Sequence, residues 1–459
     1  MAVNQAIYYL EKIIRPIAPI LQSLASDGAT CFLVGGAVRD LLLPVYHPNF
    51  SFVGLSQQGV LSSQDLDIEV FGIGLEALAK KLSAFAPTIF VGKQFGVLRM
   101  PKYHLDWSVP RKDSCGRKPK VVLDQQLSIT QALSRRDLTI NALAINLSAL
   151  QCDGLKIINM PPIIDPFGGL VDLQLGVLRP IAADKFLEDP LRFFRVMQFL
   201  ARFTFRASEE LSMLAKAMSL ERSDKQVATF IAKERITAEL VKMLTKGQRP
   251  SLGFAWLLEI GRLQELFPAL FAIWQRGDWE KFCTSLDACA QNLAFPHHCF
   301  ISKVSIISAP IVIPLACILF WINKPLLQKE FLANLSFNHG EVAQALTLAN
   351  AAATKAGNTA LDLKLQAYKL KNCSLLQLFF LRWALGILST GQEFTDLCRK
   401  AEKLKVLYRP LLALVKGSDF LALGYQQGPI IKILLDRAYY LQLNYPDLSK
   451  KDIIKKTIK

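Results

Sequence analysis

The stretch SQDLDIEVFGIG, residues 63–74, begins with an acidic residue at every second position. This alternation predicts a β-strand with Asp65, Asp67 and Glu69 on one face and apolar residues on the other. Like charges on one face are costly unless cations neutralise them. Paired aspartates that bind Mg²⁺ are the usual arrangement in phosphoryl and nucleotidyl transfer. A solvated strand edge is the competing interpretation of an Asp-x-Asp pair taken alone.

Two neighbouring segments contain further groups that suit this chemistry. LVGGAVRD places Gly35 and Gly36 at a strand-to-helix turn, where backbone N–H groups can approach phosphates, and Arg39 follows as a candidate phosphate partner. A simple tight turn is the alternative for a Gly-Gly pair. LDWSVPR offers Asp106 on another expected strand, where a third carboxylate could activate an attacking hydroxyl.

The composition indicates a folded, basic protein. The 459 residues are 51% hydrophobic and 20% charged, which is enough for a sizeable core in two or more domains. The net charge of +16 favours a polyanionic partner, and nucleic acid is the leading class. The nine cysteines include no C-x-x-C pair, so we expect reduced thiols in a cytosolic protein.

Two apolar segments bear on export and on membranes. The first residues have no basic region before their apolar ones, which predicts an amphipathic helix packed on the domain and no signal peptide. Residues 304–322 carry no charge, but Pro310 and Pro314 interrupt them. We expect a buried helix there, and a single membrane span is the alternative.

The pattern of hydrophobic residues changes along the chain. Strand-like and helix-like runs alternate over roughly the first 150 residues, which predicts a small sheet domain of α/β or α+β type. From about Ala182 onward, Leu, Ala and Phe recur at helical spacing with few strand signals. The rest of the chain should therefore be almost entirely α-helical.

Five motifs follow one another in a recognisable order over residues 31–206. They are LVGGAVRDLLL, the DLD pair, RRDLTINALAIN, DPFGGLVDL and EDPLRFFRVMQFLARFTF. Together they resemble the class II tRNA nucleotidyltransferase and bacterial poly(A) polymerase family. ERITAELVKML and GRLQELFP extend the resemblance to about residue 268.

The resemblance implies an α+β fold with a polymerase-β-like nucleotidyltransferase head and a long all-α neck and body. The implied domains are a catalytic head over residues 1–150, a base- and RNA-binding neck over 151–270 and a tRNA-binding body over 271–459. The implied activity is the addition of CCA to the 3′ end of tRNA from CTP and ATP, with Mg²⁺ as cofactor. The expected location is the cytoplasm, and the sequence gives no oligomeric state.

The resemblance also assigns roles to individual residues. Asp65 and Asp67 would hold the metals. Asp106 stands where the family usually has a glutamate in an E-x-x-x-x-R pattern, with Arg111 at the arginine. The residues implied to bind the nucleotide are Gly35, Gly36, Arg39, Arg136, Asp137, Asn141, Glu188, Asp189, Arg192 and Arg195.

In the EDPLR motif, Asp189 and Arg192 would read the incoming base, and Glu188 would orient Arg192. Residues three apart lie on one face of a helix. A carboxylate acceptor beside a guanidinium donor can satisfy the Watson–Crick edge of cytosine or adenine, whereas uracil and guanine present the reverse pattern at the exocyclic group. An ordinary i,i+3 salt bridge is the alternative.

Two further segments have a functional interpretation, one from a resemblance and one from its charge. LACILFWINKP, residues 315–325, resembles the signature helix of HD phosphohydrolase domains, but Phe320 and Trp321 replace its His-Asp pair. Aromatic rings cannot ligate a metal. We therefore expect a helical domain that lost its metal site, and coincidence in a Leu-rich helix is the alternative. The basic loop at residues 111–120 would be a mobile element over the nucleotide or simply a charged loop.

Several functions compete with CCA addition. VGKQFGVLRM, residues 91–100, lacks the His-Val end that the corresponding stretch of bacterial poly(A) polymerases usually shows, which favours the CCA-adding branch. The alternatives are a poly(A) polymerase, a partial enzyme that adds only CC or only A, and a non-catalytic RNA-binding protein.

Overall fold

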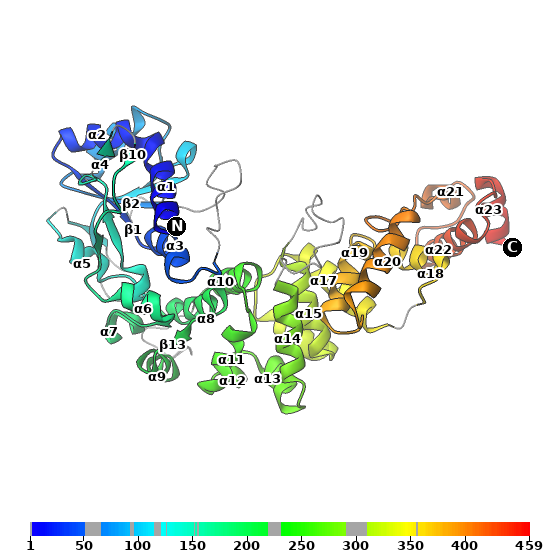
Figure 1. Cartoon of the computed structure of the whole chain (residues 1–459). Helices are drawn as coiled ribbons and strands as arrows, with labels where there is room; N and C mark the ends of the chain where they lie inside the picture. The colour runs from blue at the N-terminus through cyan, green and yellow to red at the C-terminus, as the bar shows by residue number, and fades with distance from the viewer. Residues whose placement is uncertain are drawn as a thin grey trace. The chain divides into compact units, whose positions relative to one another are not determined.

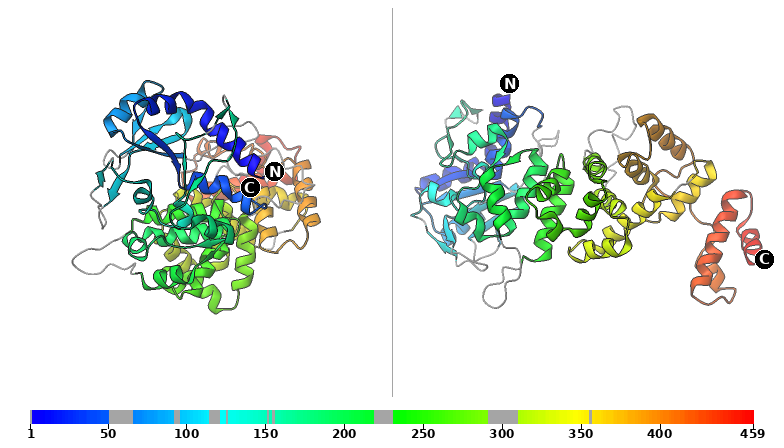
Figure 2. Two further views of the ribbon diagram at one scale, coloured as in Figure 1. Left: turned by 60° about the vertical axis from the view of Figure 1, so that its left-hand side comes forward. Right: turned by 90° about the horizontal axis from the view of Figure 1, so that it is seen from below.

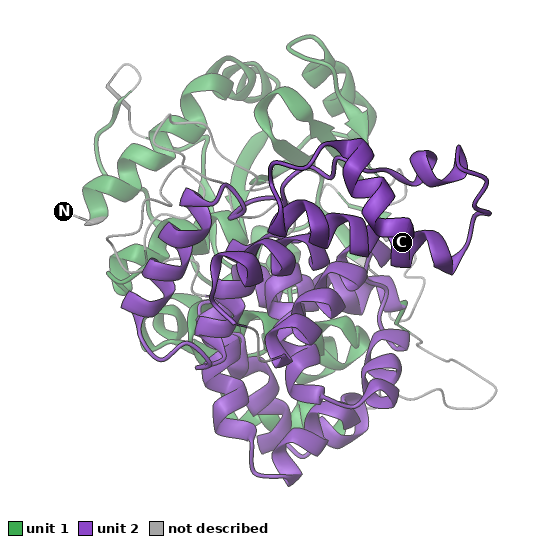
Figure 3. Cartoon of the chain, turned by 90° about the vertical axis from the view of Figure 1, so that its right-hand side faces the viewer, with its two compact units in different colours: residues 1–232 green, residues 233–459 purple. Residues whose placement is uncertain are grey.

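The computed structural model describes residues 2–50, 66–91, 96–113, 121–124, 126–150, 152–153, 156–218, 231–290, 310–354 and 357–459 (Figure 1). The chain divides into two compact units, residues 1–232 and residues 233–459, each shown in its own colour in Figure 3. The division of residues 1–459 into head, neck and body stays a prediction. Asp65 and most of the basic loop at 111–120 lie outside the described residues.

The first unit is built on a seven-stranded mixed sheet. Its order is β11 (Ile163–Ile164), β8 (Ala144–Asn146), β1 (Thr30–Val34), β2 (Leu66–Phe71), β5 (Leu105–Ser108), β4 (Val97–Met100) and β3 (Ile89–Phe90). β2 and β5 run parallel, whereas the other neighbouring pairs are antiparallel. The strands expected before the Gly35–Gly36 turn, at Asp67 and at Asp106 are therefore confirmed.

Helices before, between and after the strands complete the first unit. They are α1 (Ala2–Ile14), α2 (Ala18–Ser26), α3 (Gly36–Tyr46), α4 (Leu75–Ser83), α5 (Ile129–Leu133), α6 (Gly169–Leu175), α7 (Ala183–Glu188), α8 (Leu191–Phe203) and α9 (Glu209–Ala217). The N-terminal helix α1 packs on α3 and buries Leu10, as its amphipathic pattern predicts. The longest helix of this unit after the sheet, α8, buries nine of its thirteen side chains.

Short paired strands complete the described secondary structure of this unit. They are β6 (Arg111–Asp113) with β7 (Val121–Leu123), β9 (Cys152–Asp153) with β10 (Lys156–Ile157), and β12 (Val177–Leu178) with β13 (Arg206–Ala207). β12 and β13 tie the segment before α7 to the segment after α8. Arg111, expected at the arginine of the E-x-x-x-x-R pattern, begins β6 and lies opposite Leu123.

The second unit is helical throughout its described residues. Its helices are α10 (Lys233–Lys246), α11 (Ser251–Glu259), α12 (Leu263–Leu266), α13 (Pro268–Gln275), α14 (Trp279–Ala290), α15 (Val312–Ile322), α16 (Pro325–Ala333), α17 (His339–Ala353), α18 (Ala360–Lys369), α19 (Leu375–Ala384), α20 (Gly391–Lys403), α21 (Gly417–Leu421), α22 (Pro429–Asn444) and α23 (Lys450–Ile458). α22 and α23 pack on each other at the C-terminal end (Figure 2). The expected α+β head followed by an all-α remainder is confirmed.

The uncharged segment at residues 304–322 contributes a core helix. Its described part forms α15, which packs on α17 and α14 and buries nine of its eleven side chains. Among the described helices, none is long and apolar enough to cross a membrane. Phe320 and Trp321, which stand in place of a His-Asp pair, lie half-buried on α15 with their rings edge to face. The idea of a lost metal site here stays a hypothesis.

One buried arginine fastens three helices of the second unit. Arg382 on α19 is 5% exposed, and its Nη2 donates to the carbonyl oxygens of Ala351 and Thr354 at the end of α17. Its Nη1 donates to Oε1 of Gln366 on α18. The last carbonyls of a helix lack hydrogen-bond donors within the helix and favour a nearby cation. Arg382 supplies both the hydrogen bonds and the positive charge at the end of α17.

Arg382→Met should lower the free energy of unfolding of the second unit by about 3 kcal/mol, because buried acceptors lose their donor while the aliphatic packing is largely kept. Urea unfolding followed by tryptophan fluorescence measures the loss. Arg399→Met is the control, since Arg399 and its partner Asp396 are 51% and 59% exposed, and it should cost less than about 0.5 kcal/mol. Equal effects of the two substitutions would contradict the role given to Arg382.

Candidate active site

The register of three strands brings the predicted carboxylates together. Asp67 on β2 lies opposite Asp106 on the parallel strand β5 and opposite Val34 on β1. Residues directly opposite each other on neighbouring strands share a face of the sheet, about 5 Å apart. Val34 is followed by Gly35 and Gly36. The two carboxylates and the glycine turn therefore meet at one edge of the sheet.

Asp106 is held by an arginine that the sequence pattern did not single out. Arg99 on β4 is its register partner, and Nε and Nη2 of Arg99 donate to Oδ1 and Oδ2 of Asp106 at 2.7 Å each. The Asp106 side chain is 15% exposed and that of Arg99 is 39% exposed. Only the pairing of β4 with β5 reveals this contact, because seven residues separate the two side chains in the sequence.

Gly35 makes room for Arg136. Gly35 has φ +72° and ψ −131°, a conformation that only glycine adopts without strain. A Cβ on Gly35 would lie 2.1 Å from Nη1 of Arg136. The Gly-Gly turn is thus a close approach between the β1–α3 connection and the Arg-Arg-Asp motif. Arg136 therefore sits directly over the turn that is predicted to bind phosphates.

The charges around Arg136 belong to the same site. Burial lowers the pKa of Arg136, and the neighbouring charge of Arg135 lowers it further. The carboxylates of Glu69, Asp67 and Asp137 act in the opposite direction. These interactions place the Arg136 guanidinium within electrostatic reach of Asp67.

Glu69 occupies a different environment from Asp67. From the sequence, Glu69 could be expected to be solvated or paired with a lysine. Both interpretations are wrong, because Glu69 is fully buried and Nη2 of Arg135 lies 3.2 Å from its Oε1. Glu69 shares a face with Asp67 one pleat further along, where the Arg-Arg-Asp segment covers the sheet. Its charge stabilises the position of Arg135.

Asp137 connects the motif to α8. Its Oδ1 accepts hydrogen bonds from the backbone N–H of Leu138 and from Nδ2 of Asn141, and its Oδ2 accepts one from Nε of Arg195 at 2.6 Å. Burial raises the pKa of Asp137, but the charges of Arg195 and Arg192 and these hydrogen bonds outweigh it and lower the pKa to about 2. The carboxylate is therefore ionised at neutral pH.

Arg39 lies deeper than a phosphate ligand usually does. It is 4% exposed, and its guanidinium donates to Asp40 and to Oδ1 of Asn141. It also lies over the rings of Phe199 and Phe203 on α8, at 5.2 and 4.8 Å. In this conformation Arg39 joins α3 to α8, and its predicted contact with a triphosphate stays a prediction.

The EDPLR motif spans the junction between α7 and α8. Asp189 lies between the two helices, and its Oδ1 accepts a hydrogen bond from the N–H of Leu191. Arg192 donates to the carbonyl oxygens of Lys185 and Arg135 at 2.5 and 2.7 Å. Glu188 accepts a hydrogen bond from Lys185. The motif is thus fixed to the Arg-Arg-Asp segment, and its predicted reading of bases remains a prediction.

The DPFGGLVDL motif packs against the segment that contains Asn141. Asp165 accepts hydrogen bonds from the N–H groups of Gly169 and Leu170 at the start of α6. A Cβ on Gly169 would lie 2.2 Å from the carbonyl oxygen of Thr139, and the Thr139 hydroxyl donates to Asp172. The motif therefore packs α6 directly against the Thr-Ile-Asn segment that contains Asn141.

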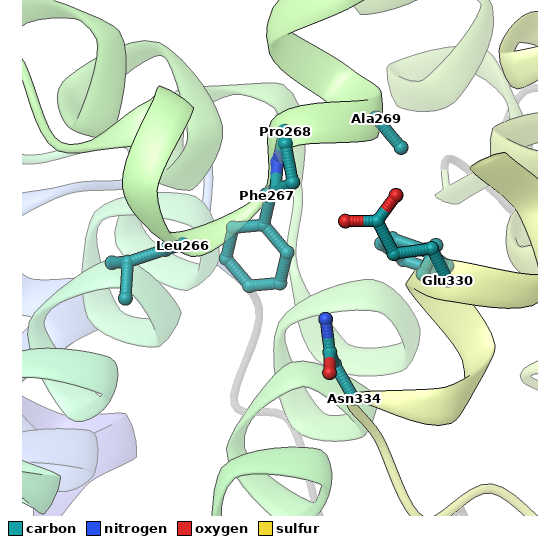
Figure 4. Close-up of a pocket in the computed structure, with 7 residues that line it drawn as sticks. Leu266, Phe267, Pro268, Ala269, Glu330 and Asn334 are labelled. Carbon is teal, nitrogen blue, oxygen red and sulfur yellow. The ribbon is translucent and has the colours of Figure 1, made fainter. Parts of the chain in front are cut away.

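Two cavities of the second unit are lined by residues other than those of the carboxylate edge. A cavity of about 10 Å³ lies between the α12–α13 turn and α16, with Glu330 and Asn334 facing Phe267 and Pro268 (Figure 4). That volume suits one water molecule. A wider, mainly apolar groove of about 430 Å³ lies between α16 and α17. Among the described residues, no three His, Cys, Asp or Glu side chains group as a metal site.

Gly35→Ala should destabilise the first unit more than Gly28→Ala. Gly28 has φ +80° and nothing within 4 Å of an added Cβ, so its substitution costs only backbone strain of about 1–2 kcal/mol. Alanine at position 35 must also displace Arg136, so we expect at least about 1 kcal/mol more. Thermal unfolding of both variants makes the comparison, and equal losses would exclude the close contact.

Asp137→Asn should flatten the acid dependence of stability. The folded pKa of about 2 lies below the unfolded value of about 3.9, so the carboxylate stabilises the fold by about 2 kcal/mol above pH 4. This contribution is lost as the pH falls toward 2. The difference in stability between wild type and variant should shrink over that window in urea titrations. Exposed Asp184, substituted by Asn, is the control and should leave the slope unchanged.

The comparisons with known proteins support the same region. The family "Poly A polymerase head domain" matches residues 31–179. "Multifunctional CCA protein" of Neisseria gonorrhoeae is 35% identical over 257 residues, which are 54% of this chain and 53% of that protein. The protein of the same name from Burkholderia mallei is 34% identical over 256 residues, 54% of each chain. The chain spans about half the length of the curated relatives it matches.

Two solved structures share the fold over nearly the whole chain. The Bacillus stearothermophilus CCA-adding enzyme in complex with CTP aligns with a TM-score of 0.66 and 21% identity, covering 97% of both chains. The Thermotoga maritima CCA-adding enzyme complexed with tRNA_CCA aligns with a TM-score of 0.54 and 20% identity, covering 99% of this chain and 98% of that one. At these identities the likeness shows the fold alone.

Over residues 31–179 the chain is therefore similar to the poly(A) polymerase head domain family, and about half of it is similar to multifunctional CCA proteins. Its fold is shared with solved CCA-adding enzymes over nearly the whole chain.

Proposed function

We propose that this protein is a tRNA nucleotidyltransferase that adds CCA to the 3′ end of tRNA from CTP and ATP. The observation that supports this most directly is the register of Asp67 with Asp106 beside the Gly35 turn, with Arg136 over that turn. The same residues lie in the part of the chain, residues 31–179, that matches the poly(A) polymerase head domain family. In this proposal the 3′-hydroxyl of the RNA attacks the α-phosphorus of the incoming nucleotide.

The carboxylate edge fits a hard divalent cation. Asp67 and Asp106 come from adjacent parallel strands, and carboxylate oxygens are the ligands that Mg²⁺ prefers. Asp67 and the predicted ligand Asp65 would hold the cation. When bound, it would lower the pKa of the attacking hydroxyl and stabilise the leaving pyrophosphate.

The surrounding residues would position the triphosphate. The turn at Gly35 and Gly36 begins α3, and backbone N–H groups at a helix start favour phosphate oxygens. Arg136 lies over the same turn with a guanidinium that matches phosphate geometry. Asp137 and Asn141 fix this segment to α8 through Arg195. The proposed roles of these residues are thus to orient the nucleotide against the carboxylates.

The nucleotide base would be read at the α7–α8 junction. Two of the guanidinium nitrogens of Arg192 already donate to backbone carbonyls of Lys185 and Arg135. A side chain fixed in this way loses little freedom when a base binds, which favours a template made of protein. Asp189 would accept a hydrogen bond from the exocyclic amine of cytosine or adenine, and Arg192 would donate one to the neighbouring ring nitrogen. Arg195 would be a further nucleotide-binding residue.

The remaining proposals concern the partner and the cell. The net charge of +16 suits an RNA backbone, and one solved structure that shares the fold was determined with tRNA. We propose that the helical body contributes to tRNA binding and that the protein works in the cytoplasm.

Three tRNA primers distinguish the product: one that ends before CCA, one that ends after C and one that ends after CC. With CTP, ATP and Mg²⁺, we expect addition that completes CCA on each primer and then stops. Unlimited addition of A to any RNA would instead identify a poly(A) polymerase. Addition of A to the CC-ended primer alone, or of C without A, would identify a partial enzyme.

Asp67→Asn should reduce nucleotide addition at least about 1000-fold, because the substitution removes a charged ligand from the metal edge while it keeps the size of the side chain. Quantitative primer extension measures the loss. Glu76→Gln, an exposed position on α4, is the matched control and should keep full activity. Binding of tRNA without turnover by wild type would support the non-catalytic alternative.

A further inference from the structure

We propose that Arg99 is a positioning residue for Asp106 and a built-in counter-charge that weakens the binding of divalent metal at the carboxylate edge. This inference rests on the proposed function and deepens it. It concerns a residue that lies outside the five motifs, on β4 next to the catalytic strand β5.

The geometry places Arg99 in one row with the carboxylates. The register runs from Val34 through Asp67 and Asp106 to Arg99, across β1, β2, β5 and β4. At a strand spacing of about 4.8 Å, the backbone of Arg99 is only about 10 Å from that of Asp67 on the same face. The guanidinium reaches back along this row to Asp106.

The contact occupies both oxygens of the Asp106 carboxylate. Two parallel hydrogen bonds of 2.7 Å form the paired arrangement that is the strongest between arginine and carboxylate. Asp106 is 15% exposed, so water screens the pair only partly. The carboxylate is thereby held in one orientation, and one positive charge offsets it.

The shorter side chain of aspartate makes such a holder useful. The resemblance placed Asp106 where glutamate is usual, and aspartate reaches one methylene less far. Both of its oxygens accept hydrogen bonds from Arg99 on β4. A cation shared by Asp67 and Asp106 would have to approach a carboxylate that already carries a counter-charge. Arg99 therefore sets how much metal the site requires.

The test is a titration with Mn²⁺ as the probe, in which electron paramagnetic resonance reports free Mn²⁺ in the presence of the full-length protein and no nucleotide. Arg99→Gln should bind Mn²⁺ about 5-fold more tightly than wild type, since it removes one repulsive charge at close range. Arg99→Lys keeps that charge and should bind within about twofold of wild type. Lys80→Gln removes one exposed charge from α4 and should change nothing.

The outcomes separate this inference from the proposed function. Unchanged or weaker Mn²⁺ binding by Arg99→Gln, with binding abolished by Asp67→Asn, would overturn the inference and leave the metal edge intact. An absence of saturable binding in every variant would overturn both. Tighter binding by Arg99→Gln and Arg99→Lys alike would show that geometry alone matters and would overturn the counter-charge.

Discussion

The site depends on the buried carboxylate of Asp137. It accepts hydrogen bonds from the backbone N–H of Leu138, from Asn141 and from Arg195, and so it joins the turn after α5 to the long helix α8. A buried charge is tolerated only when its partners replace the hydrogen bonds lost with water. The buried Asp137 carboxylate has such partners on both of its oxygens. Arg135 and Arg136 immediately precede Asp137. Fixing Asp137 therefore also fixes the Arg136 guanidinium over the Gly35 turn and the Arg135 carbonyl that accepts from Arg192.

Arginine–carboxylate pairs recur through the first unit and shape its electrostatics. Arg135 faces Glu69, Arg99 faces Asp106, and Arg202 on α8 faces Asp40 on α3. Each pair joins elements that are distant in the sequence or on separate strands, and arginine suits this role because its rigid fork matches a carboxylate. The acidic edge of the sheet is therefore not a bare cluster of like charges. It is a set of carboxylates that differ in how fully arginine already neutralises them.

The two halves of the chain are supported by evidence of different kinds. Residues 31–179 match a family model, about half of the chain is 34–35% identical to multifunctional CCA proteins, and the motifs fall on the candidate site. In the second unit the likeness to solved structures shows the fold alone. There the sequence supplies the physical requirements of a helical core, such as the apolar α15 and the buried Arg382.

The sequence by itself determined the fold class, the strands that carry Asp67 and Asp106, a buried helix within residues 304–322 and the grouping of Asp67 with the Gly35 turn. These features follow from local periodicity and from motifs whose spacing is short. Tertiary structure alone decided the partners. The pairing of β4 with β5 gave Asp106 to Arg99, and the packing of the Arg-Arg-Asp segment buried Glu69 against Arg135. The packing of α3 against α8 buried Arg39 over the rings of Phe199 and Phe203, and its expected contact with phosphate stays a prediction. Contacts between residues far apart in the chain leave no periodic signal, so no pattern could predict them.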